Sequence, residues 1–76
     1  MKKCTIQLAS IKDVREFVDT VTKYEMEIDL SSGRYVVDAK SIMGIFSLDL
    51  LNPIGVTIHS DDCADLLNDL KKFIID

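Results

Sequence analysis

The order of apolar and polar positions predicts alternating strands and helices along the chain. Residues 3–8 alternate, with Ile6 and Leu8 on one face, which is typical of a strand. From residue 11 to about residue 24, apolar side chains recur at three- and four-residue steps, as in an amphipathic helix. Ser10 precedes this helix and Asp13 follows three residues later, so we expect Ser10 to cap it.

The middle of the chain predicts a hairpin followed by a short helix. Residues 25–30 alternate without exception, which indicates a strand with one wet and one dry face. Residues 31–34 contain Gly33 and predict a turn, after which residues 35–39 return as a second strand. Residues 41–48 are short and apolar, and we expect a helix capped by Ser41 that ends before Pro53.

The last third predicts one more strand, over residues 54–59, and one more helix. Residues 60–62, Ser-Asp-Asp, supply a cap and negative charge for that helix. The order β-α-β-β-α-β-α predicts a single α+β domain over residues 1–76, with three helices on one face of a four-stranded antiparallel sheet. The expected core comprises Ile11, Val14, Val18, Val21, Met26, Ile28, Leu30, Val56, Ile58, Leu66, Leu70 and Ile74, with Phe17 widening the first helix's stripe.

Composition and charge narrow the classes of function. A chain with 47% hydrophobic and 29% charged residues is typical of a globular domain. No run approaches the roughly 20 apolar residues of a membrane span, and the N-terminus lacks the apolar stretch of a signal peptide, so we expect a cytoplasmic protein that binds no membrane. The net charge is −4 and the basic residues are scattered, which argues against binding to nucleic acid.

Few residues offer catalytic or metal-binding chemistry. Cys4 and Cys63 are too few for a disulfide scaffold or a zinc cluster, so we expect free thiols, no metal and no cofactor. The pattern does not decide whether either thiol has a redox role. His59 is the sole histidine and lies at a strand end. A nucleophilic pair of Cys63 and His59 is the enzymatic alternative, but no third group is identifiable to orient it, so we expect no enzyme.

Two segments carry a resemblance to a known family. Residues 40–48, Lys-Ser-Ile-Met-Gly-Ile-Phe-Ser-Leu, and residues 22–24, Thr-Lys-Tyr, resemble HPr, the histidine-containing phosphocarrier of the bacterial sugar phosphotransferase system. The order of elements also matches, and the resemblance extends from about Ser10 to Ile74. It implies an open-faced sandwich with sheet order 1-4-2-3.

The sequence departs from this family at the phosphoacceptor. The family has Gly-(Ile/Leu)-His-Ala-Arg-Pro-Ala at the start of its first helix. Counting without gaps from Lys23 and Tyr24, Ser10 stands in place of the histidine, Lys12 in place of the arginine and Asp13 in place of the proline. A serine phosphoester is too stable to pass its phosphoryl group onward. We therefore expect no phosphocarrier activity.

The remaining candidate site is the segment that begins at Ser41. The resemblance implies phosphorylation of this serine by an HPr-type serine kinase, and docking of that kinase and of a transcriptional regulator on the apolar residues that follow. Helical spacing assigns Ile45 and Leu48 to the sheet. It leaves Ile42, Met43 and Phe46 on another face, at least partly exposed, as a docking surface for a protein partner. The alternatives are self-association through this surface, and a degenerate domain that binds proteins with no phosphate chemistry; the oligomeric state stays open.

Overall fold

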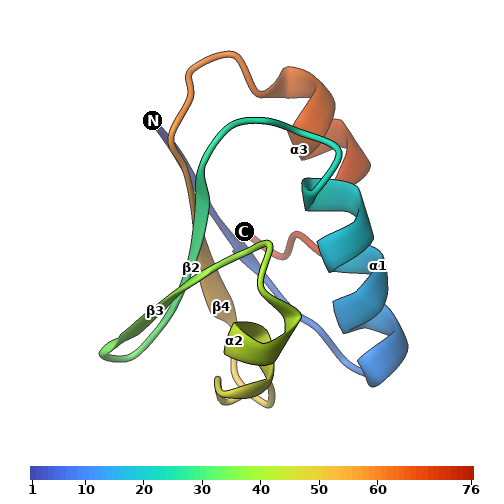
Figure 1. Cartoon of the computed structure of the whole chain (residues 1–76), viewed down its shortest axis with the longest axis vertical. Helices are drawn as coiled ribbons and strands as arrows, with labels where there is room; N and C mark the ends of the chain where they lie inside the picture. The colour runs from blue at the N-terminus through green and yellow to red at the C-terminus, as the bar shows by residue number, and fades with distance from the viewer.

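A four-stranded antiparallel sheet carries the helices on one of its faces in the computed structural model, which describes residues 1–76 (Figure 1). The spatial order of the strands is β1-β4-β2-β3. The strands are β1 (Lys2–Ile6), β2 (Ile28–Ser32), β3 (Tyr35–Asp38) and β4 (Ile54–Ile58). The helices are α1 (Ile11–Val21), α2 (Ile42–Phe46) and α3 (Ala64–Asp69). The predicted fold class, element order and strand order are confirmed.

The register of the strands explains the position of the core. Val56 of β4 lies opposite Cys4 of β1 and Leu30 of β2, and Leu30 lies opposite Val37 of β3. Because side chains alternate along a strand, this row faces the helices, while neighbouring rows face solvent. The buried apolar residues form one cluster between the sheet and the helices.

The predicted strand at residues 25–30 is shifted in the structure. Residues 25–27 belong to the connection from α1 to the sheet, and β2 begins at Ile28 and ends at Ser32. Alternation of apolar and polar residues indicates which face of a segment is exposed to solvent, but it does not indicate where pairing with a neighbouring strand begins. The hairpin turn is accordingly only two residues long, and Gly33 adopts φ +59°, a conformation that favours glycine.

The last helix also differs from the prediction. Its N-cap is Cys63, and Ser60 instead accepts a hydrogen bond from the backbone N–H of Asp62 at 3.1 Å. The helix ends at Asp69, and turns then carry the chain to Phe73. The Phe73 ring is buried and meets the Phe17 ring edge-on, with 6.0 Å between centroids.

The predicted core is right for most positions and wrong for one. Ile11 is 65% exposed, because it is the first residue of α1 and lies before the helix packs onto the sheet at Val14. Three further predicted members are half-buried at the edges of the core: Val18, Met26 and Ile74. Buried residues absent from the predicted core include Ile6, Leu8, Ala39, Ile54, Cys63 and Phe73, while Ile45 and Leu48 are buried as helical spacing predicts.

The two edges of the sheet have different surroundings. The segment at residues 73–76 runs along the outer edge of β1, where Thr5 N donates to Asp76 O and Gln7 N donates to Phe73 O, both at 2.9 Å. Ile6 forms an antiparallel bridge with Ile74 in the same segment. The opposite edge is β3, whose outer side is not paired with any other strand.

Candidate functional site

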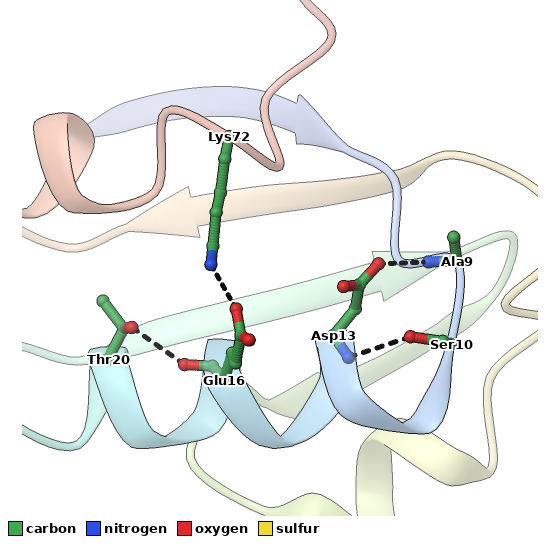
Figure 2. A network of polar contacts seen from close by, with 6 residues as sticks. All are labelled: Ala9, Ser10, Asp13, Glu16, Thr20 and Lys72. Atoms are coloured by element: carbon green, nitrogen blue, oxygen red, sulfur yellow. Dashed lines mark hydrogen bonds and ion pairs between the residues drawn. The ribbon is translucent and has the colours of Figure 1, made fainter.

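The start of α1 is closed by two short-range hydrogen bonds (Figure 2). Ser10 is the N-cap, as predicted, and its Oγ accepts a hydrogen bond from Asp13 N at 3.2 Å. Asp13 Oδ2 in turn accepts from the backbone N–H of Ala9 at 2.9 Å. This is a variant of the capping box in which the acidic side chain bonds one residue before the N-cap. Two donors at this helix start are thereby satisfied by the chain itself.

This arrangement affects what the helix start can bind. Backbone N–H groups and the helix dipole favour an anion at an N-terminus. Here the carboxylate of Asp13 supplies that anion, so an incoming phosphoryl group meets a negative charge of the chain. The hydroxyl of Ser10 is also engaged as an acceptor in the cap.

The only imidazole lies at the other end of the sheet. Ser10 follows the last residue of β1, Ile6, which pairs with Ile54 at the start of β4. His59 follows the end of β4, beside the first residue of β1. His59 Nε2 lies 2.8 Å from Asp29 Oδ2, so the imidazole has a carboxylate partner of its own. The two positions are too far apart for His59 to take the place of a histidine at the start of α1.

The Cys-His alternative gains no support from the geometry. Cys63 is buried and its side chain makes no capping hydrogen bond to α3, while the ring of His59 is bonded to Asp29. Burial first, and then the neighbouring Cys63, raise the pKa of the Cys4 thiol. A raised thiol pKa lowers the thiolate fraction at neutral pH, and the thiolate is the reactive form.

Contacts on the outer side of α1 join it to the C-terminal segment. Lys72 forms an ion pair with Glu16 across the two elements (Figure 2). The ammonium of Lys72 also lies 5.2 Å from the centroid of the Phe73 ring. These contacts hold the helix in place and bring no further reactive group to its N-terminus.

The short helix α2 follows the hairpin and begins at Ser41, its predicted N-cap. Ser41 is exposed, and its Oγ accepts a hydrogen bond from Gly44 N at 3.1 Å. Gly44 allows close packing here, because a Cβ at this position would lie 3.2 Å from Ser41 Oγ and 3.2 Å from Val37 Cβ. The glycine therefore lets α2 approach β3.

The two sides of α2 differ in the way the sequence predicts. Ile45 and Leu48 are buried in the core. Met43 is 77% exposed and Phe46 42% exposed, while Ile42 is half-buried and packs against the edge of the core. Together Ile42, Met43 and Phe46 form the α2 patch. The structure thus brings this apolar surface next to the hydroxyl-bearing cap at Ser41.

Sequence reasoning missed two features of the molecule's surface. One is the hydrogen bond from Ala9 N to the carboxylate of Asp13. An acidic residue three positions after the N-cap is the sequence pattern that could have predicted it. The other is the exposure of Tyr35 and Val36 on β3, which alternation alone does not reveal because it does not identify an edge strand.

Comparisons with known proteins give a consistent result. Residues 11–76 match the family model described as "PTS HPr component phosphorylation site". HPr-C-His from Thermoanaerobacter tengcongensis is similar in structure, with a TM-score of 0.80, 29% identity, and coverage of 95% of this chain and 89% of that one. The phosphocarrier protein HPr from Bacillus anthracis str. Ames shares the fold, with a TM-score of 0.74, 23% identity, and coverage of 96% and 95%.

The comparison with curated proteins gives no significant match. The family match begins at Ile11, immediately after Ser10. None of the helices is long and apolar enough to span a bilayer.

Proposed function

This chain belongs to the HPr family, and from that premise we propose that it is a member without phosphocarrier activity that binds a protein partner through the α2 patch. The observation that carries the proposal is the exposure of Met43 and Phe46 on a helix whose other side is buried. Exposed apolar side chains gathered in one place favour an interaction surface, and Met and Phe are enriched in such surfaces. The partner classes we propose are an HPr-type serine kinase and a transcriptional regulator.

The loss of phosphocarrier activity is supported by chemistry at the start of α1. A relay needs a nitrogen nucleophile, whereas gapless counting from Lys23 and Tyr24 puts Ser10 at the corresponding position, and its oxygen would form a stable ester. Asp13 adds a negative charge beside it through its bond to Ala9 N. Without phosphocarrier activity, the α2 patch is the feature of the molecule on which we base the proposed function.

Replacing one exposed side chain tests the docking surface. We expect Met43→Asp to weaken binding of an HPr-type serine kinase or regulator from the same host at least tenfold, because a charge would be desolvated in an apolar contact. Since Met43 is exposed, the melting temperature should change little. Titration calorimetry measures the binding. Ile75→Asp is the matched control, an exposed apolar residue outside the α2 patch. Equal affinities for wild type and Met43→Asp would refute this docking site.

Ser41 is proposed as a phosphorylation site that regulates the same surface. Its hydroxyl is exposed at the N-terminus of α2, and a phosphate there would add about −1.5 to −2 charge beside the α2 patch. We expect an HPr-type serine kinase to transfer phosphate from ATP to the wild type and to Ser47→Ala, but not to Ser41→Ala. Mass spectrometry of the intact chain and of its peptides measures the transfer. Absence of transfer to the wild type would favour the alternative function, protein association with no phosphate chemistry.

A further inference from the structure

The edge strand β3 lacks the protection that the other edge of the sheet has. Residues 73–76 cover β1, whereas no segment covers β3 (Figure 1). Proteins usually protect such an edge with lysine, proline or a bulge, because its free backbone groups can pair with another chain. The β3 sequence is Tyr-Val-Val-Asp, and its pairing with β2 runs without interruption from Ser32 and Tyr35 to Asp29 and Asp38.

The register shows which backbone groups are free. Ala39 N donates to Ile28 O at 2.9 Å, so the hydrogen-bonded pairs of this hairpin are 28 with 39, 30 with 37 and 32 with 35. The backbone of Val36 and of Asp38 therefore faces away from β2. The carbonyl of Asp38 accepts from Ser41 N at 3.0 Å. Val36 N–H, Val36 C=O and Asp38 N–H remain without partners in the sheet.

Side chains at this edge are apolar on both faces of the sheet. Tyr35 is 70% exposed and Val36 is 65% exposed. They are consecutive residues of one strand, so Tyr35 lies on the helix side and Val36 on the open side. Arg34 and Asp38 lie two positions before and two positions after Val36. The edge therefore has an apolar centre with opposite charges at its two ends.

We propose that β3 is the interface of a homodimer, in which two copies of this chain pair antiparallel about Val36. In this register Val36 N–H of each copy donates to Val36 C=O of the other. Arg34 then lies opposite Asp38 of the second copy, and the same contact recurs at the other end. Asp38 N–H also reaches the carbonyl of Arg34 across the interface.

The charge arrangement favours a second copy over an unrelated peptide. A two-fold axis at Val36 makes the surface self-complementary, since each positive end meets a negative end. Tyr35 of one copy then lies beside Val37 of the other, a half-buried residue on the helix side. Opposite charges and aromatic contacts with β-branched residues are both favourable cross-strand pairs. The inference stands independently of the proposed docking function, because it uses no residue of the α2 patch.

Charge reversal at the two ends provides a test of this register. Sedimentation equilibrium over rising concentration should show reversible dimers for the wild type. Arg34→Glu places like charges opposite Asp38, and Asp38→Lys places like charges opposite Arg34, so each variant alone should be monomeric. Mixed together they should form heterodimers, since both ends are then oppositely charged. A wild type that stays monomeric at millimolar concentration, or single variants that still dimerise, would overturn the proposal.

Asp38→Lys also removes a carboxylate that accepts a hydrogen bond from Lys40 N at 2.9 Å, so this variant could lose the dimer through a local change in the monomer. A proline variant tests the interface without that change. Val36→Pro removes an N–H that has no partner within the sheet, so the folded monomer should survive while the dimer is lost. Ile75→Asp at the opposite edge should leave the dimer intact. The Val36 amide should exchange with solvent at least tenfold more slowly in concentrated than in dilute wild type. Unchanged exchange, or a dimer of Val36→Pro, would place the interface elsewhere.

Discussion

Ser10, Asp13 and Ala9 close the start of α1 with two short-range hydrogen bonds. The hydroxyl of Ser10 caps α1 and the carboxylate of Asp13 accepts from Ala9 N, so the helix start is satisfied without any bound anion. A cap of this kind contributes about 1 kcal/mol to stability. Neither of these two side chains contains a nitrogen that could carry a phosphoryl group in a relay.

We therefore expect no phosphoryl transfer to this chain from the first enzyme of the phosphotransferase system. Incubation with that enzyme and phosphoenolpyruvate, followed by mass spectrometry at neutral pH, should show no acid-labile phosphoryl adduct. The Bacillus anthracis phosphocarrier HPr serves as the positive control. An acid-labile adduct on His59 would contradict the expectation, since that is the only imidazole in the chain.

Tyr24 makes a contribution to the stability of the fold that depends on pH. Its hydroxyl donates to the carboxylate of Asp69, and this bond, with the nearby negative charge, raises the pKa of Tyr24 from 10.0 to about 12. The folded state thus holds the proton longer than the unfolded chain. The stabilisation is complete below pH 10 and is lost as the pH rises toward 12. Urea unfolding of the wild type at several pH values should show this loss, and Tyr24→Phe should show a weaker dependence between pH 10 and 12.

At the scale of elements, α3 offers two adjacent leucines in different surroundings. Leu66 is fully buried, whereas Leu67 is only half-buried at the edge of the core. We expect Leu66→Ala to lower the free energy of unfolding by about 3 kcal/mol, through lost burial and the cavity left behind. Leu67→Ala should cost about 1 kcal/mol, since less apolar area leaves the core. Denaturant melts measure both, and equal losses would mean that α3 does not pack as described.

The elements also show what the sequence can predict. Periodicity identifies the inner faces of α1 and α2, and Ser10 and Ser41 mark where both helices begin. It does not identify the start of β2, because the alternation begins at residue 25, three residues before the strand. Phe73 escapes prediction for a related reason. It is buried by a turn after α3, where no helical spacing applies.

The candidate site was predictable to a similar extent. The spacing around Ser41 correctly separates buried Ile45 from exposed Met43 and Phe46. Ile42 is partly exposed, as expected, because a five-residue helix lying close to β3 covers only part of that side chain. The exposed β3 edge depends on strand order, which comes from pairing between distant segments and is not encoded in local spacing.

At the scale of the whole molecule, the proposed dimer determines how the α2 patch is presented. Antiparallel pairing of the two β3 strands joins the two sheets into one continuous sheet. The copies are then related by a two-fold axis perpendicular to that sheet. The helices of one copy cover one face of the sheet (Figure 1). In the proposed dimer both helix layers therefore lie on the same side. Two α2 patches on one side permit bivalent capture of a dimeric regulator, with a gain set by effective concentration.

The covered edge of the sheet has a consequence for the order of folding. β1 obtains its strand partners from β4 and from the segment at residues 73–76, and none from the residues next to it in the chain. A hairpin such as β2–β3 closes a short loop, whereas β1 must wait for a long loop to close at a greater entropic cost. During synthesis β1 emerges from the ribosome before the other three strands, whereas its partner β4 is the last of the strands to emerge. β1 therefore has no strand partner until β4 has emerged, and during that time both its edges are open to other chains.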